Sequence, residues 1–300
     1  MIYTVTLNPA VDYTLRMEEL SAGNLHRPSQ TSLSFGGKGI NVSRVLTALG
    51  TPNCALGFVA GDVGRMLESG LRRLGVDTDF AYLAEGETRI NVKIAAGEET
   101  EINARGPWVD TAAFDRLIAR VAAIADGDTL CLCGSLPQGC ASDTYARLLA
   151  QIAERDVYTV VDTTGEALLC ALAYRPYLIK PNRDELCALA GRALPDEESV
   201  ITAARELQQK GARNVLVSLG GDGALLLTED SMVIRREAYR GEVRGTVGAG
   251  DSMVAGYLAA LERGADAREA LRFAVAAGSA TAFSDELATR EAIESLLAMD

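Results

Sequence analysis

The chain has 300 residues and a formal net charge of −12. This acidic balance argues against nucleic acid and anionic membranes as partners, so any anionic ligand must be held by a local basic cluster. No apolar run reaches the roughly 18 residues of a membrane span, and the N-terminus lacks an export signal, so we expect a cytoplasmic protein. The single histidine, His26, lies in a polar stretch, which argues against a Ser-His-Asp or Cys-His mechanism and against a zinc enzyme.

The first motif follows a predicted strand. Residues 2–7 form a β-branched run that stops at Asn8-Pro9, which indicates a buried strand. Asp12 comes shortly afterwards, near the carboxyl end of that strand, where open α/β sheets bind their ligands. A solvated loop acid is an equally good interpretation of Asp12 on these grounds alone.

A second motif is the glycine-rich turn formed by Gly36, Gly37 and Gly39, which opens an amphipathic helix. Such a turn lets a ligand approach the backbone, and Lys38 and Asn41 can supply a charge and an amide hydrogen bond. The motif is not a P-loop, because Lys38 is followed by glycine instead of serine or threonine. The chain also contains no GxGxxG pattern, so we do not expect a dinucleotide-binding protein.

Two strands with alternating character follow, at residues 88–94 and 100–103, with a turn at 97–99 between them. Strict alternation predicts a sheet with one covered face and one polar face. The polar face carries Arg89 and Lys93, a basic cluster that suits a phosphate group. A solvated sheet face is the alternative interpretation.

The rest of the chain predicts an α/β fold with a mostly parallel central sheet and helices on both faces. From residue 110 onward it alternates strands (129–133, 158–162, 214–219, 224–228) with helices (114–124, 144–154, 200–209). We expect a main domain made of residues 1–11, 36–85 and 107–300. Residues 12–35 and 86–106 are expected to form a small β-sheet that is inserted twice into it.

The stretch Thr246–Gly256 carries the clearest chemistry. Gly248 and Gly250 permit a sharp turn before an amphipathic helix, and Asp251 is expected at the helix start as its cap. The free N–H groups and the dipole of the helix would bind an anion. A carboxylate beside an anion site is what phosphoryl transfer requires, although an ordinary capped helix after a glycine turn fits this stretch equally well.

These motifs together resemble the ribokinase-like (PfkB) family of sugar kinases, and within it the branch that acts on sugar phosphates. The matching segments, which cover essentially the whole chain, are Thr6–Pro9 with Asp12, Gly36–Asn41, Gly134–Pro137, Lys180–Asn182 and Thr246–Gly256. The stretches Glu87–Lys93 and Ala282–Thr289 are most similar to the bacterial 1-phosphofructokinase subfamily, with the tagatose-6-phosphate kinases as close relatives. The resemblance implies a ribokinase-like fold in which the small sheet is a lid.

The resemblance also implies a role for each matching residue. The catalytic group would comprise Asp251 as the base and Gly248 in the turn before it, with the backbone N–H groups of Ala249 and Gly250 forming the anion hole. The sugar phosphate would contact Asp12, Gly36, Gly37, Lys38, Asn41, Arg89, Lys93 and Ser135. The nucleotide would contact Lys180, Asn182, Ser218, Gly220, Gly221, Asp222, Gly223, Gly250 and Asp251. Asn182 and Glu185 would hold Mg²⁺ largely through water, although their spacing also fits a plain helix capping box.

The resemblance therefore implies that ATP and a sugar phosphate are the ligands, Mg²⁺ is the cofactor, and a homodimer forms through the lid sheet. The expected reaction converts fructose 1-phosphate to fructose 1,6-bisphosphate, with tagatose 6-phosphate as the alternative substrate. A sugar-phosphate sensor on the same scaffold is an alternative of a different class. The sensor is disfavoured because a sensor has no need of the base Asp251.

Overall fold

The computed structural model describes residues 1–299, with the side chains of all of these except residues 98 and 99. Nine strands form the main sheet in the order β13-β12-β11-β10-β9-β8-β1-β4-β5. Their bounds are β1 Ile2–Thr6, β4 Asn53–Val59, β5 Asp77–Tyr82, β8 Thr129–Cys133, β9 Tyr158–Asp162, β10 Leu178–Ile179, β11 Asn214–Ser218, β12 Ala224–Leu227 and β13 Val233–Arg236. All neighbours from β5 to β11 pair in parallel, whereas β12 and β13 are antiparallel.

The predicted mostly parallel sheet is therefore confirmed, while two of its edge strands escaped the sequence analysis. β5 and β13 form the two edges of the sheet. Neither reads as a continuous apolar run, since β5 begins with Asp-Thr-Asp and β13 ends with two arginines. Edge strands bury fewer side chains than central ones, and their hydrophobic signal is correspondingly weaker.

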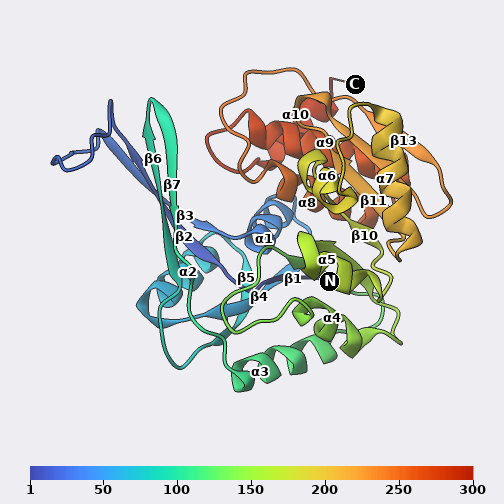
Figure 1. The fold of residues 1–300 in the computed structure, drawn as a ribbon, viewed down its shortest axis with the longest axis horizontal. Coiled ribbons are helices and arrows are strands. Elements are labelled where there is room, and N and C mark those ends of the chain that lie inside the picture. The colour runs from blue at the N-terminus through green and yellow to red at the C-terminus, as the bar shows by residue number, and fades with distance from the viewer. Residues whose placement is uncertain (300) are drawn as a thin grey trace.

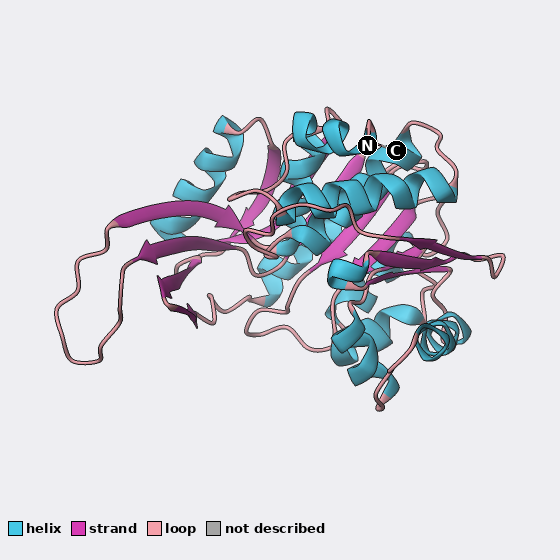
Figure 2. Ribbon diagram, turned by 90° about the horizontal axis from the view of Figure 1, so that it is seen from above, coloured by secondary structure: helices cyan, strands magenta, loops and turns pink. Residues whose placement is uncertain are grey.

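Helices cover both faces of this sheet, as Figures 1 and 2 show. One face packs against α3 Thr111–Ala122, α4 Thr144–Leu149, α5 Gly165–Leu172, α6 Arg183–Ala190 and α7 Glu197–Gln209. The other packs against α1 Lys38–Ala48, α8 Ala249–Glu262, α9 Ala267–Ala282 and α10 Arg290–Leu297. The remaining helical segments are α2 Gly61–Arg73 and two short 3₁₀ turns at Ala150–Ile152 and Gly220–Asp222. No helix among residues 1–299 is both long and apolar enough to span a bilayer.

Four strands form a second, smaller sheet in the order β3-β2-β6-β7, which stands away from the main body (Figure 1). They are β2 Ala10–Arg16, β3 Gln30–Gly36, β6 Arg89–Ala96 and β7 Glu98–Asn103. The turn between the last two is shorter than predicted, because β7 begins directly after Gly97.

The two faces of the small sheet differ in chemistry, as the alternation predicts. Asp12 pairs in register with Asn91 on one face, and Tyr13 pairs with Leu33 and Val92 on the other. Near the main body the apolar face rests on α2, where the Phe35 ring fills the space that a side chain at Gly70 would need. The polar face is left free to border the site described next.

Candidate active site

A cavity of about 1010 Å³ is lined by residues that follow the carboxyl ends of the central strands, by the small sheet and by the start of α8. Most of the predicted site residues line it, namely Asp12, Gly37, Lys38, Asn41, Arg89, Ser135, Lys180, Asn182, Glu185, Ser218, Gly220, Gly221, Gly223, Gly248, Ala249, Gly250 and Asp251. Three predicted residues, Gly36, Lys93 and Asp222, are not part of its wall. Segments far apart in sequence therefore meet in one space.

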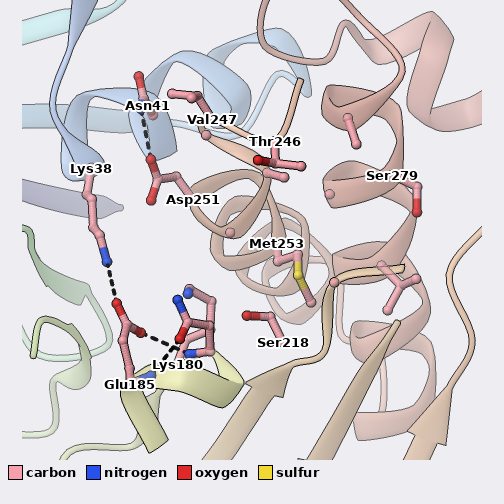
Figure 3. A pocket seen from close by; sticks show the side chains of 18 of the residues that line it. Lys38, Asn41, Lys180, Glu185, Ser218, Thr246, Val247, Asp251, Met253 and Ser279 are labelled. Carbon is pink, nitrogen blue, oxygen red and sulfur yellow. Dashed lines mark hydrogen bonds and ion pairs between the residues drawn. The ribbon is translucent and has the colours of Figure 1, made fainter. Parts of the chain in front are cut away.

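Asp251 does not cap α8, in contrast to the expectation from sequence. The cap position is Gly248, whose positive φ of 79° suits glycine, and Asp251 is the third helical residue. Its carboxylate accepts a hydrogen bond from the Asn41 side chain at 2.8 Å, a contact visible in Figure 3. Freed from capping, the carboxylate is aimed into the cavity.

The pKa of Asp251 is raised to about 6, which is opposite in direction to the effect of the helix dipole alone. Burial is the main cause, since the residue is only 6% exposed, and the negative charge of Asp162 adds to it. The hydrogen bond from Asn41 and the charges of Lys38 and Lys180 act in the other direction. A carboxylate of this kind is ionised at neutral pH and is a better proton acceptor than an ordinary aspartate.

The first turn of α8 presents free backbone N–H groups, but not the pair predicted. Ala249 N donates to Thr246 O at 3.2 Å, so this N–H group is already used. The N–H groups of Gly250 and Asp251 have no acceptor among the described residues. A side chain at Gly248 would collide with Leu287, so glycine is required there. The second and third N–H groups of the helix are therefore the ones available to an anion.

On the small-sheet side, the carboxylate of Asp12 is held by its neighbours. It accepts a hydrogen bond from Asn91 at 2.8 Å and lies 3.6 Å from the Lys93 ammonium. Gly36 is needed here because a Cβ would approach the Asp12 carboxylate to 2.8 Å. Lys93 also pairs with Glu101 at 3.8 Å, so it supports Asp12 from outside the cavity.

The two remaining basic residues predicted for the sugar phosphate lie apart. Arg89 lines the cavity next to the small sheet, where its guanidinium donates to the carbonyls of Asn8 and Ala104 at 3.2 Å each. Lys38 instead reaches across the cavity toward Glu185, at 3.7 Å (Figure 3). Its ammonium is even closer to Asp162, at 3.1 Å. Lys38 therefore lies near the predicted metal residue and not with Arg89.

Asn182 and Glu185 form a true capping box at the start of α6. The Asn182 side chain accepts from Glu185 N at 2.7 Å, and Glu185 Oε2 accepts from Asn182 N at 2.9 Å. The other carboxylate oxygen, Oε1, is directed at Lys38 on the cavity side. Capping and ligand binding are thus compatible, because each uses a different oxygen of Glu185.

Two features in and beside the cavity were missed by sequence analysis. Asp162 ends β9 fully buried beside the cavity, and its only sequence signal is its place directly after an apolar strand. A largely apolar wall consists of Met253, Val275, Gly278, Ser279, Ala282 and Phe283 with Tyr239. The residues of α9 in this wall recur at helical spacing, so in sequence they are indistinguishable from core.

The chain is similar to known proteins over nearly its whole length. Residues 5–291 match the model of the pfkB family carbohydrate kinases. A 1-phosphofructokinase of Bacillus subtilis is 41% identical over 297 residues, covering 99% of this chain and 97% of the relative. A D-tagatose-1-phosphate kinase of Bacillus licheniformis is 41% identical over 289 residues, covering 96% and 94%.

Among solved structures, phosphofructokinase-2 of Escherichia coli in complex with fructose-6-phosphate superimposes with a TM-score of 0.92. It is 32% identical, and the match covers 99% of this chain and 98% of that one. The family model and these relatives span nearly the whole chain, including both sheets. The chain therefore belongs to the pfkB family of carbohydrate kinases.

Proposed function

We propose that the protein transfers the γ-phosphoryl group of ATP to the 6-hydroxyl of fructose 1-phosphate, giving fructose 1,6-bisphosphate and ADP. The observation that carries the proposal is the buried Asp251 carboxylate beside unpaired N–H groups, in a cavity large enough for two ligands. The 1-phosphofructokinase of Bacillus subtilis, 41% identical to this chain, supports the choice of sugar phosphate.

In this reaction Asp251 acts as the base. Its carboxylate, held by Asn41, accepts the proton of the sugar hydroxyl while the hydroxyl oxygen bonds to the γ-phosphorus. The bond between that phosphorus and the bridging oxygen to the β-phosphate breaks, and ADP leaves. The N–H groups of Gly250 and Asp251 stabilise the charge on the transferred group, because they point at it without needing to reorganise.

The nucleotide occupies the side of the cavity formed by the later strands. Its phosphates face Lys180, Asn182 and the glycine-rich turn after β11, to which Ser218, Gly220, Gly221 and Gly223 belong. Its base lies against the apolar wall around Phe283. Asp222 belongs to the same turn but is not among the residues that line the cavity, so we do not expect it to contact the ligand.

Magnesium is the cation that fits this site. Mg²⁺ prefers oxygen ligands and keeps several of its waters, so one carboxylate and the phosphates of ATP suffice to hold it. Glu185 Oε1 faces the cavity, and Asn182 lies beside it. The ion would neutralise phosphate charge, which a protein of net charge −12 cannot do overall.

The sugar phosphate occupies the side next to the small sheet. Asp12, Gly37 and Asn41 hold its hydroxyl groups, and Arg89 with Ser135 holds its phosphate. D-Tagatose 1-phosphate is a second candidate substrate, supported by the similarly related kinase of Bacillus licheniformis. Tagatose 6-phosphate remains an alternative of the same class. A sensor without activity would not need an unpaired anion site next to a base.

We further propose that the small sheet, residues 12–35 and 86–106, is a lid whose outer face pairs with a second copy of the chain. One row across its four strands consists of Leu33, Tyr13, Val92 and Ile102. Leu33, Tyr13 and Ile102 are 46%, 37% and 58% exposed. Burial of such a row is favourable, and a symmetric pair of lids would cover it while both polar faces stay on their sites.

Asp251→Asn should lower kcat by ~10²–10⁴-fold with little change in KM, since the amide keeps the size but cannot accept the proton. In the parent enzyme kcat/KM should fall as the pH drops through about 6, because the raised pKa protonates the base there. Steady-state assays across pH measure both effects. Asp266→Asn, at the cap of α9, is the control. Near-normal turnover of the Asp251 variant would refute the assignment. So would a parent enzyme whose kcat/KM falls only near the ordinary pKa of an aspartate.

Glu185→Gln should raise the Mg²⁺ concentration needed for half-maximal activity, because the amide retains the capping hydrogen bond but loses the charge. A magnesium titration at saturating substrates measures this. Glu269→Gln is the matched control, since Glu269 is likewise the third residue of its helix, α9. An unchanged titration curve would leave Glu185 with a capping role only.

Arg89→Ala should reduce kcat/KM for fructose 1-phosphate by roughly 10- to 100-fold, the value of a hydrogen bond to a charged group, and leave that for fructose almost unchanged. The assay compares fructose 1-phosphate, tagatose 1-phosphate, tagatose 6-phosphate, fructose 6-phosphate and fructose. Arg65→Ala, on α2 and paired with Asp62, is the control. If fructose is used as well as its phosphates, the basic side of the cavity does not select substrate. If a tagatose phosphate is preferred, our choice of sugar is wrong.

Ile102→Glu should convert the dimer into a monomer, because it places a charge within the apolar row, at its β7 end. Sedimentation velocity over a range of protein concentrations measures the mass. Leu74→Glu is the control, since Leu74 is similarly exposed (50%) at the end of α2. A parent protein that sediments as a monomer at all concentrations would contradict the lid-mediated dimer.

A further inference from the structure

The most deeply buried charge next to the cavity is a residue that the proposed mechanism does not yet use. The Asp162 side chain is 0% exposed at the carboxyl end of β9, in register with Cys133 of β8, and Thr163 and Thr164 after it line the cavity. One oxygen, Oδ1, lies 3.1 Å from the Lys38 ammonium and 3.6 Å from the Lys180 ammonium. The other oxygen, Oδ2, is buried and has no hydrogen-bond partner among the described residues.

The two lysines reach this carboxylate from different elements of the fold. Lys38 is the first residue of α1, directly after Gly37 on the sugar side. Lys180 follows β10, and its ammonium lies 3.0 Å from the position that a Cβ at Gly250 would occupy. The Lys180 ammonium is therefore next to the start of α8, and the charge of Lys38 also acts on Asp251 in that first turn.

Stability alone is a poor explanation for this arrangement. A buried ion pair recovers little more than the cost of desolvating its charges, and an apolar side chain often does better. Here Oδ1 pairs with two ammonium groups, whereas Oδ2 is buried with no hydrogen-bond partner among the described residues. A buried oxygen without a partner costs stability. Without the negative charge, two ammonium groups this close would repel each other and their flexible stems would move apart.

We propose that Asp162 is a positioning residue for phosphoryl transfer: its Oδ1 atom holds the ammonium groups of Lys38 and Lys180 on either side of the transferred group. The inference rests on the proposed kinase function. Preorganised cations of this kind stabilise the charge of the transition state without having to move during the reaction. Lys38 thus serves the transferred phosphoryl group and not the phosphate of the sugar.

The same carboxylate acts on the base. The charged groups that face Asp251 are Lys38 from α1, Lys180 from the end of β10 and Asp162 from β9, with the neutral Asn41 beside them. Asp162 is the only anion of this set, and it raises the pKa of Asp251. Removal of its charge should therefore lower the pKa of Asp251, whereas removal of either lysine charge should raise it.

The test is the variant Asp162→Asn, which keeps the size of the side chain. We expect kcat to fall about 100-fold, the usual effect of a misplaced catalytic group, with KM for the sugar phosphate changed less than about threefold. In Asp162→Asn the acid limb of the pH profile, the range in which kcat/KM falls as the pH drops, should move to lower pH. In Lys38→Met it should move to higher pH. Asp79→Asn, which removes a carboxylate paired with Arg120 at the surface, is the control.

Several outcomes would overturn the proposal. An unchanged kcat or an unmoved acid limb in Asp162→Asn excludes a positioning role. A variant that regains full kcat when Mg²⁺ is raised indicates that the carboxylate serves the metal instead. If Asp162→Asn fails to fold by thermal melting, Lys38→Met and Lys180→Met decide, since an unmoved limb in both contradicts the charge network.

The failure of the proposed function is recognised separately. If the parent protein phosphorylates none of the sugars in the panel, the kinase assignment fails before any variant is measured. If it prefers another sugar, the variants are compared on that substrate, and the role of Asp162 is tested unchanged.

Discussion

The site depends on the parallel alignment of the central strands. In a parallel sheet the carboxyl ends of all strands lie on the same side of the sheet. Residues that follow different strands therefore meet there although they are far apart in sequence. Thr6, Cys133 and Asp162 occupy one row across β1, β8 and β9. Lys180 follows β10, the next strand, and Ser218 is the last residue of β11. The carboxyl ends of the strands supply most of the polar groups on the main-domain side of the cavity.

The helices that start beside these carboxyl ends provide the other half of the site. α1 and α8 both begin at the cavity after a glycine with positive φ, Gly37 at 123° and Gly248 at 79°. Each glycine allows a turn so tight that a side chain there would collide with Thr6 or Leu287. The helix starts therefore bring Lys38 and Asp251 into the same space. The hydrogen bond between Asn41 and Asp251 connects the two helices directly.

Charge in the cavity is balanced locally, in a protein whose overall charge is −12. Lys38 and Lys180 share Asp162, and Lys38 also faces Glu185. Burial lowers the pKa of the Lys38 ammonium, but the surrounding carboxylates outweigh this and raise it above its usual value, so the group stays charged. The cavity can then accept polyanionic ligands although the rest of the surface would repel them.

The sequence by itself determined the fold class and most of the site. Apolar runs separated by helical periodicity predicted a mostly parallel sheet, because buried parallel strands must be apolar along their whole length. The glycine-rich turns pointed to Lys38, Asn41 and Asp251, since glycine before a helix marks a close approach of ligand to backbone. Edge strands β5 and β13 escaped because polar and charged residues interrupt their apolar runs.

Only the tertiary structure decided how these groups act on one another. It placed Lys38 with Asp162 and Glu185 instead of Arg89, and it turned Asp251 from a helix cap into a buried carboxylate whose pKa is raised to about 6. It also placed Asp162 next to the cavity and assembled the wall around Phe283. These results depend on burial and on distances between segments more than 100 residues apart. Local sequence patterns carry no information about either quantity, because they report only the conformation of neighbouring residues.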